Sequence, residues 1–225
     1  MEPITTNIFC LIGKPGSGKE TILHKLISDT EFSTKYNINK LIYGTTRPMR
    51  EGEIDGYNYH FFTKKEFDNI DPKEFIESRS YDNIYINDIY WYFTLKRDIV
   101  LGNNYIAKVS TFQYSEFKRW AFLSQLENSM HRIHIYPVMI EAPIFERVKR
   151  LIEISNTEQD IYNMCSKLIT EQFEFKTVVQ KNPELIDILN KDTCIIDNSY
   201  HGELYIKKAI LNLKSFIINK ISTQR

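Results

Sequence analysis

The sequence has little cysteine, glycine or proline and no excess of charge of either sign. Its 225 residues include three cysteines, eight glycines and seven prolines. These counts exclude collagen-like, proline-rich and disulfide-framework proteins. Lysine and arginine together number 29, as do aspartate and glutamate, so the formal net charge is zero. A neutral chain has no long-range field to attract nucleic acid or an anionic membrane, and we expect neither as a partner.

The sequence also has no long hydrophobic run and no leader pattern. Its first apolar run, Ile8–Ile12, is too short for a signal peptide or a membrane-spanning helix, and no basic segment precedes it. The cysteines Cys10, Cys165 and Cys194 form no CxxC pair, so neither a disulfide framework nor a zinc site is indicated. We therefore expect a soluble protein in the reducing cytoplasm.

What the sequence does contain is enough apolar material for a core, arranged as strands that alternate with helices. Hydrophobic residues make up 42% of the chain, a share typical of folded domains rather than of disordered segments. Four short apolar runs, each followed by a helical pattern, predict buried strands at residues 8–12, 105–109, 133–140 and 193–196. This alternation predicts an α/β fold with a parallel sheet flanked by helices.

Two segments interrupt the alternation. Residues 44–94 carry turn signals and alternating aromatics without a helical period, which predicts a small, mostly β insertion in a core formed by 1–43 and 95–225. Residues 153–160 are polar and lie between two helical patterns, so we expect a helical lid at about 148–165. No linker divides the sequence into independent halves.

The strongest local signal is the glycine-rich segment Gly13–Lys19, which reads GKPGSGK. Glycines allow the backbone to turn its N–H groups around phosphate oxygens, and the following helix adds the positive end of its dipole. Lys19 would reach the β- and γ-phosphates as a mobile point charge. A glycine-rich turn without a ligand is the alternative, but the flanking strand and helix favour a phosphate site. The predicted ATP site contains Gly13, Lys14, Pro15, Gly16, Ser17, Gly18 and Lys19.

One position departs from the usual form of such a loop. The pattern GxxxxGK(S/T) places a hydroxyl after the lysine to hold Mg²⁺, whereas this chain has Glu20 followed by Thr21. A carboxylate at Glu20 could bind the metal through water, or Thr21 could supply part of the missing hydroxyl. We include both residues in the predicted ATP and metal sites.

A second constellation lies in residues 45–61, which read TTRPMREGEIDGYNYHF. Arg47 and Arg50 stand three apart around a proline, close enough to converge on one phosphate dianion as charge-assisted donors, and Tyr59 can add a neutral hydroxyl. A solvated basic turn with packed aromatics is the alternative. The phosphate interpretation predicts a site for a second, phosphorylated substrate.

Together the two constellations resemble the guanylate kinase family. The family pattern TTRxxRxGExxGxxYxF is matched at every fixed position of residues 45–61, downstream of the phosphate loop. The resemblance implies a P-loop NTPase-type fold and ATP-dependent phosphoryl transfer to GMP or dGMP, with Mg²⁺ as cofactor. Its implied partners are the nucleotides ATP and GMP, and we expect a monomer or homodimer.

The resemblance assigns the acceptor residues one by one. Arg47, Arg50 and Tyr59 would hold the phosphate of GMP. Glu77, in the stretch Phe75–Glu77, would accept the N1–H and N2–H groups of guanine together. Adenine presents an acceptor at N1 and would leave that carboxylate unpaired. An ordinary surface carboxylate is the alternative for Glu77.

The stretch Trp91–Thr94 stands where the family shows Tyr-Tyr-Gly-Ser/Thr. The resemblance therefore assigns Tyr92 to the phosphate of GMP and Thr94 to the base. Phe93 replaces the family's glycine, and Tyr92 could equally be a core aromatic.

Two acids that the family carries are missing. The family has an LDxD stretch after the next strand, whose acids serve the nucleotide and its metal, whereas this chain reads Ala107–Ser110. Because Glu20 is gained where those acids are lost, we hypothesise that the charge supporting the metal has moved to Glu20.

Later residues complete the comparison with the family, which places arginines on the helix entering the lid to clamp the transferring phosphoryl group. This assigns Arg147 and Arg150, while Lys167 falls where a later arginine is common. Surface charges on an amphipathic helix are the alternative. Asn198 resembles an asparagine that contacts adenine, and it could equally cap the last helix. The predicted catalytic residues are Lys19, Arg47, Arg147 and Arg150.

Two other functions fit parts of the sequence. One is a catalytically silent, guanylate-kinase-like binding module; the intact Lys19 favours activity, and the missing acids favour silence. The other is a nucleoside monophosphate kinase with a different acceptor, because Tyr43, Phe93 and Lys108 alter the base side of the site.

Overall fold

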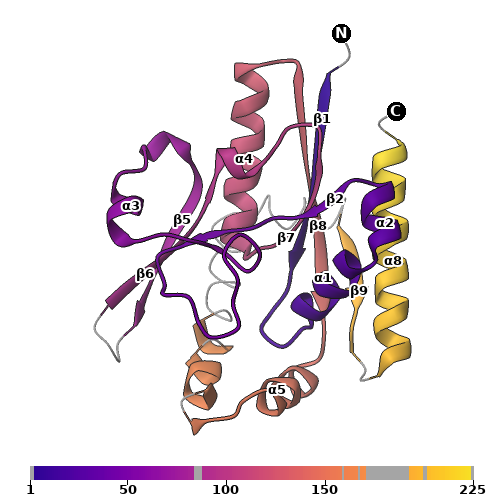
Figure 1. Ribbon diagram of the computed structural model, residues 1–225. Helices are drawn as coiled ribbons and strands as arrows, with labels where there is room; N and C mark the ends of the chain where they lie inside the picture. The colour runs from indigo at the N-terminus through magenta and orange to yellow at the C-terminus, as the bar shows by residue number, and fades with distance from the viewer. Residues whose placement is uncertain are drawn as a thin grey trace.

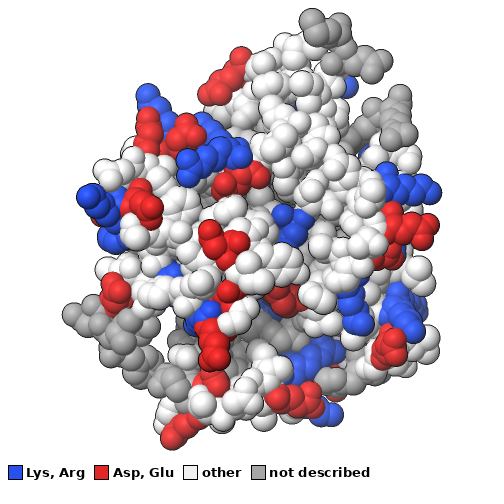
Figure 2. All heavy atoms as spheres, viewed as in Figure 1, with Lys and Arg blue, Asp and Glu red and all other residues white. Residues whose placement is uncertain are grey.

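The computed structural model describes residues 3–83, 88–158, 160–166, 168–170, 193–199 and 202–223. It contains a five-stranded and a four-stranded sheet, which Figure 1 shows beside one another. Acidic and basic side chains are interspersed over the face seen in Figure 2. Within the described ranges, no helix is both long and apolar enough to cross a membrane.

The five-stranded sheet has the order β2-β7-β1-β8-β9, and every neighbouring pair is parallel. Its strands are β1 (Ile4–Ile12), β2 (Ile38–Lys40), β7 (Asn104–Lys108), β8 (His131–Glu141) and β9 (Cys194–Asp197). Four of them confirm the strands predicted from apolar runs, and the parallel α/β architecture is confirmed with them. The remaining strand, β2, was missed because three residues are too few to show a period.

The central strand β1 is buried on both faces because helices pack on each side of the sheet. Alternate residues of Ile8–Ile12 enter one core with α4 (Thr111–Glu127) and a second core with α1 (Lys19–Ser28) and α8 (Glu203–Ser222). Figure 1 shows α4 and α8 on opposite sides of the sheet, with α2 (Thr30–Lys35) close to α8. This double burial explains the continuous apolar run in the sequence.

Residues 44–95 form the second sheet, in the order β4-β3-β6-β5. Its strands are β3 (Gly44–Thr45), β4 (His60–Phe61), β5 (Phe75–Asn83) and β6 (Asp88–Leu95), accompanied by α3 (Lys64–Asp68) and the 3-10 turns Pro72–Glu74 and Lys96–Asp98. β6 is antiparallel to both β3 and β5, whereas β3 and β4 are parallel. The segment leaves the core sheet after β2 and returns before β7.

The two faces of the second sheet differ in character. Phe67 of α3 packs on Trp91 and Phe93 of β6, with ring centroids 5.0 and 5.1 Å apart. Because successive residues of a strand point to opposite faces, Tyr92 and Thr94 lie on the other side. That other face carries the polar side chains of the site.

Two segments meet at the carboxyl edge of the core sheet. The glycine-rich loop follows β1, and α5 (Ile144–Glu153) follows β8. Because β1 and β8 are neighbouring parallel strands, the segments that follow them lie close together. Figure 1 shows α5 at this edge, near the start of α1, and residues 160–166 form further helix beyond it.

Candidate active site

The glycine-rich loop is held in a shape that only glycine permits at two positions. Gly16 and Gly18 have φ angles of 72° and 95°. A β-carbon on Gly16 would lie 2.4 Å from the carbonyl oxygen of Arg147, and one on Gly18 would lie 2.3 Å from Nδ2 of Asn198. The loop is therefore packed directly against α5 and the end of β9.

The two predicted arginines of α5 contact the carbonyl side of this loop. Arg147 donates from Nη1 to the Pro15 oxygen at 3.2 Å, and Arg150 donates from Nη1 to the Gly16 oxygen at 3.3 Å. Because N–H and C=O point in opposite directions across a trans peptide, the Pro15 carbonyl held by Arg147 turns the Gly16 amide away from α5. The Ser17 amide, in contrast, donates to the Lys14 carbonyl at 3.1 Å. The arginines thus fix the loop from its carbonyl side.

Asn198 and Lys19 complete the support of the loop. Asn198 donates from Nδ2 to the Ser17 oxygen at 2.8 Å, and its own carbonyl accepts a bond from Arg150 at 2.7 Å. Its side chain therefore does not cap the last helix, whose N-cap is Gly202. Lys19 donates to the carbonyls of Gly13 and Lys14, which keeps its ammonium at the loop. Lys167 lies outside the described residues.

Glu20, predicted as a metal ligand, forms an ion pair with Lys108 at the end of β7. Burial raises the pKa of Glu20, but the charge and hydrogen bond of Lys108 outweigh it, and nearby Lys40 and Lys19 add to the net lowering. The pair is exposed, with 66% of the Glu20 side chain and 37% of the Lys108 side chain accessible. Thr21 is exposed as well.

In the structure, the carboxylate predicted to replace the missing acids is paired with a lysine. A metal bound by Glu20 would have to displace that exposed pair, and the hypothesis that the metal-supporting charge moved to Glu20 stays a prediction. Ser110 stands where the family has the second acid of its LDxD stretch. Its hydroxyl caps α4 by accepting a bond from the backbone N–H of Gln113 at 3.2 Å. No cluster of three or more potential metal ligands occurs in the part of the chain that is described.

On the acceptor side, Arg47 is buried and held by Glu53. Its guanidinium donates from Nη2 to Glu53 Oε1 and from Nη1 to the Pro48 oxygen, both at 2.7 Å. The second oxygen of Glu53 accepts the backbone N–H of Arg50 at 2.8 Å. Burial lowers the pKa of Arg47, but its bonds to Glu53 and to the Tyr92 hydroxyl raise it overall, so Arg47 stays a cation.

The predicted aromatic residues gather around this arginine. The Arg47 guanidinium carbon lies 5.5 Å from the ring centroid of Tyr59, and the rings of Tyr59 and Tyr92 are 5.8 Å apart. Arg50 lies on the same turn, and its charge contributes to lowering the pKa of Asp160, after the larger effect of hydrogen bonds from Thr157 and Asn156. The segment beyond α5 is therefore within electrostatic reach of the acceptor site.

Glu77 is buried among hydrogen-bond donors on the polar face of the second sheet. Its Oε1 accepts bonds from Thr94 Oγ1 at 2.8 Å and from Gln113 Nε2 at 3.1 Å. Its Oε2 is buried and has no hydrogen-bond partner among the described residues. Burial raises the pKa of Glu77, although Arg79, Thr94 and Gln113 partly oppose the shift. A buried carboxylate with one open oxygen suits the recognition of a ligand N–H.

Of the three substitutions expected to alter the base side, Phe93 and Lys108 point elsewhere, whereas Tyr43 lies near it: burial is the main cause of its raised pKa, and the charges of Glu77 and Arg79 also act on it. Phe93 packs on the aromatic face of the second sheet, and the Tyr43 hydroxyl donates to the Lys108 carbonyl at 2.9 Å, next to the core. The Lys108 ammonium pairs with Glu20. Sequence reasoning missed instead Arg79 and Gln113, which contact the Glu77 network from β5 and α4.

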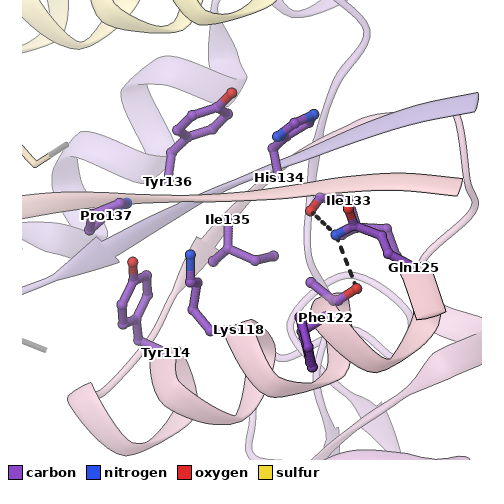
Figure 3. A pocket seen from close by; sticks show the side chains of 10 residues that line it. Tyr114, Lys118, Phe122, Gln125, Ile133, His134, Ile135, Tyr136 and Pro137 are labelled. Carbon is purple, nitrogen blue, oxygen red and sulfur yellow. Dashed lines mark hydrogen bonds between the residues drawn. The ribbon is translucent and has the colours of Figure 1, made fainter. Parts of the chain in front are cut away.

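A separate hollow between α4 and β8 contains none of the predicted site residues. Tyr114, Lys118 and Ile135 lie between the helix and the strand, while His134 and Tyr136 point away from the helix (Figure 3). Gln125 donates from Nε2 to the Ile133 and Ala121 carbonyls, both at 3.1 Å (Figure 3). Gln125 thus links α4 to β8 through backbone carbonyls.

Comparison with known proteins gives a consistent result. The family model described as guanylate kinase matches residues 5–94. A guanylate kinase of Mycoplasmopsis pulmonis is 30% identical over 191 residues, which cover 79% of this chain and 88% of that protein. A guanylate kinase of Ehrlichia chaffeensis is 28% identical over 220 residues, which cover 97% of this chain and 90% of that protein.

Among solved structures, the fold is similar to that of guanylate kinase from Anaplasma phagocytophilum. The TM-score is 0.58 at 16% identity, and the match covers 98% of this chain and 88% of that one. At this identity the likeness supports the fold, and the sequence relatives support the family.

Proposed function

The chain belongs to the guanylate kinase family, and from this premise we propose that it transfers the terminal phosphoryl group of ATP to GMP or dGMP, giving ADP and GDP. The observation that carries the proposal is Glu77, whose buried Oε2 lacks a partner within the described residues, on the same sheet as the Arg47 cluster. An anionic acceptor for N–H groups beside a cationic phosphate site is the complement of a guanine nucleotide.

On the donor side, the loop amides and Lys19 would bind the β- and γ-phosphates. Arg147 and Arg150 act here as positioning residues, because each donates to a carbonyl of the phosphate loop. Asn198 shares that task through its bond to the Ser17 carbonyl, and the family resemblance further assigns it to adenine.

On the acceptor side, Arg47, Arg50 and Tyr59 would hold the GMP phosphate in line with the γ-phosphate, with Tyr92 supporting Arg47. No general base is required, because the attacking phosphate oxygen is already anionic at neutral pH. Catalysis then consists of positioning the substrates and neutralising their charge. Closure of the segment near 148–165 would exclude water from the site.

Magnesium would enter with ATP as its phosphate complex. Mg²⁺ commonly keeps several waters and binds substrate phosphates rather than an all-protein cage. The pairing of Glu20 with Lys108 supports this arrangement over a protein-held metal.

We also propose that the chain works in the cytoplasm as a monomer or homodimer, with nucleotides rather than nucleic acid as partners. All three cysteines are free thiols, and the zero net charge offers no general attraction for nucleic acid.

A catalytically silent, nucleotide-binding module is the second candidate. The observation that favours it is the ion pair of Lys108 with Glu20, the residue that follows Lys19 of the phosphate loop. Both functions predict GMP binding, and only the kinase predicts turnover.

An assay of ADP release separates them. Mg·ATP is supplied with GMP, dGMP, AMP, CMP, UMP or dTMP, and the Lys19→Ala variant serves as the blank. Turnover selective for GMP and dGMP, and absent from the blank, supports the kinase. GMP binding without turnover supports the silent module, and turnover of another monophosphate contradicts the proposed acceptor.

A further inference from the structure

A second charged side chain of β5, Arg79, lies beside Glu77 and has an unused donor. Arg79 donates from Nη1 to Gln113 Oε1 at 2.6 Å and more weakly to Ser110 Oγ at 3.4 Å. Its Nε is buried and has no hydrogen-bond partner in the described part of the structure. A buried N–H without a partner carries a free-energy cost that a ligand acceptor would relieve.

Strand geometry places Arg79 on the same face as Glu77. The two residues are two apart on β5, and their partners across the ladder are Tyr92 and Thr94 of β6. Residues at this spacing line one face of a sheet. Gln113 bonds to both side chains, at 2.6 Å to Arg79 and 3.1 Å to Glu77, so the two groups lie close together.

Arg79 also fixes the direction of the Gln113 amide. Its guanidinium and the Ser110 backbone N–H, at 3.0 Å, both donate to Gln113 Oε1. The Gln113 NH₂ group must then face Glu77, where it donates to Oε1 beside Thr94. Glu77 Oε2 is left as the acceptor that a ligand can use.

Resting on the proposed function, we propose that Glu77 and Arg79 recognise the base as an acceptor–donor pair, so that the site takes 6-oxopurine monophosphates as a class, IMP included. A 6-oxopurine presents N1–H beside the acceptor O6, which matches a carboxylate beside a guanidinium. Adenine presents the reverse order, with a lone pair at N1 and an amino group at C6, and both contacts become unfavourable.

The resemblance assigns the C2 amino group, which distinguishes GMP from IMP, to Glu77 together with N1–H, but Oε1 of Glu77 already accepts bonds from Thr94 and Gln113, so one open oxygen would serve both groups. At the position where the resemblance calls for a second acid, Ser110 binds Gln113 and Arg79 instead. A second contact to an oxygen that already accepts N1–H changes affinity by about tenfold or less. We therefore expect IMP to bind within about tenfold of GMP, and AMP to bind at least about a hundredfold more weakly.

Calorimetric titration of GMP, IMP and AMP without ATP or metal tests this inference independently of turnover. Replacement of Arg79 by glutamine should lower the preference of both 6-oxopurines over AMP by about tenfold or more. Arg79→Lys keeps the charge but not the planar donors, so its preference for 6-oxopurines over AMP should lie between those of wild type and Arg79→Gln. Arg97→Gln is the matched control, because Arg97 lies over Phe62 and is exposed. Thermal melting of each variant verifies that it folds.

Two results would overturn the inference: IMP binding a hundredfold more weakly than GMP, or Arg79→Gln and Arg79→Lys both keeping the wild-type selectivity while folded. Failure of the proposed function looks different. If GMP and IMP bind with Arg79-dependent selectivity but release no ADP with Mg·ATP, base recognition stands and the kinase activity does not.

Discussion

The acceptor site and the exposed edge beside the phosphate loop differ in how their charges are held. Arg47 and Glu77 are only 6% and 4% exposed, and each is fixed by two or more hydrogen bonds. At the other edge, the Glu20 and Lys108 side chains are 66% and 37% exposed and pair mainly with each other. Buried charges require matched partners, whereas exposed ones can be exchanged at little cost. The chain keeps its family pattern in the first region and departs from it in the second.

Within the acceptor site, two carboxylates are shifted in opposite directions. Hydrogen bonding from Arg47 lowers the pKa of Glu53, whereas burial raises the pKa of Glu77. Glu53 is therefore a structural anion whose charge is used inside the protein. Glu77 is a buried carboxyl group whose second oxygen has no partner among the described residues.

The largest effect is expected from Glu77→Gln. The change replaces the open acceptor oxygen, so kcat/KM for GMP should fall by at least about a hundredfold. Steady-state kinetics of the variant and of wild type measure this, and a fall of less than about tenfold would contradict the assignment.

Glu77→Gln should also change how thermal stability depends on pH. Because the folded pKa of Glu77 lies above its unfolded value, ionisation costs stability as the pH rises through the unfolded and folded values. Glu77→Gln should therefore melt at the same or a higher temperature than wild type near pH 7. The difference should shrink below about pH 4, where the carboxyl group is protonated in both states.

The next effect concerns two glycines with similar backbone angles in the two regions. Gly16 and Gly52 have φ of 72° and 78°, but only Gly16 lies against backbone, and a β-carbon on Gly52 would meet nothing within 4 Å. Gly16→Ala should lower the free energy of unfolding by at least about 2 kcal/mol, and Gly52→Ala by about 1 kcal/mol. Denaturant titration of both variants gives the two values. Equal losses would show that the loop is not braced by α5.

A smaller effect is expected for Glu53→Gln, which removes the charge that orients Arg47. The KM for GMP should rise about tenfold, since a charge-assisted pair becomes a neutral contact. The matched control is Glu66→Gln, because Glu66 also has a lowered pKa but caps α3 through Thr63. The pKa values of both carboxyl groups are lower in the folded than in the unfolded protein. Each carboxylate therefore stabilises the protein at a pH above its unfolded pKa, and this contribution is lost as the pH falls through its folded pKa. Only Glu53→Gln should change the KM.

The smallest effect is expected at the exposed edge. Removing the ion pair with Lys108→Ala should change the free energy of unfolding by less than about 1 kcal/mol, as should Lys64→Ala at the exposed Lys64–Asp68 pair. Turnover with GMP should stay within about tenfold of wild type, because loop amides and Lys19 bind the phosphates. Complete loss of turnover in Lys108→Ala would show that this edge takes part in catalysis.

Local patterns were sufficient to predict four strands of the core sheet, and they also led to the predicted phosphate loop and acceptor side chains. Ile8–Ile12 was recognisable because burial on both faces leaves a continuous apolar run. The position of Phe93 could also have been deduced, since assigning Tyr92 and Thr94 to the site places the residue between them on the opposite face.

Long-range pairs were not predictable in this way. Lys108 meets Glu20 across 88 positions, and Gln113 meets Glu77 across 36. Nothing in the spacing of residues along the chain reports which side chains a parallel sheet and an inserted sheet bring together. Both contacts changed the interpretation, the first by occupying a predicted metal ligand and the second by revealing Arg79 beside the base site.

The most direct test of the central claim is a single-turnover reaction with ATP labelled at the γ-phosphate, GMP, Mg²⁺ and protein in excess over ATP. If the loop and the acceptor site work together in one chain, the label appears in GDP, and both Lys19→Ala and Glu77→Gln suppress it. Label that remains in ATP, or that appears only in inorganic phosphate, would contradict the account.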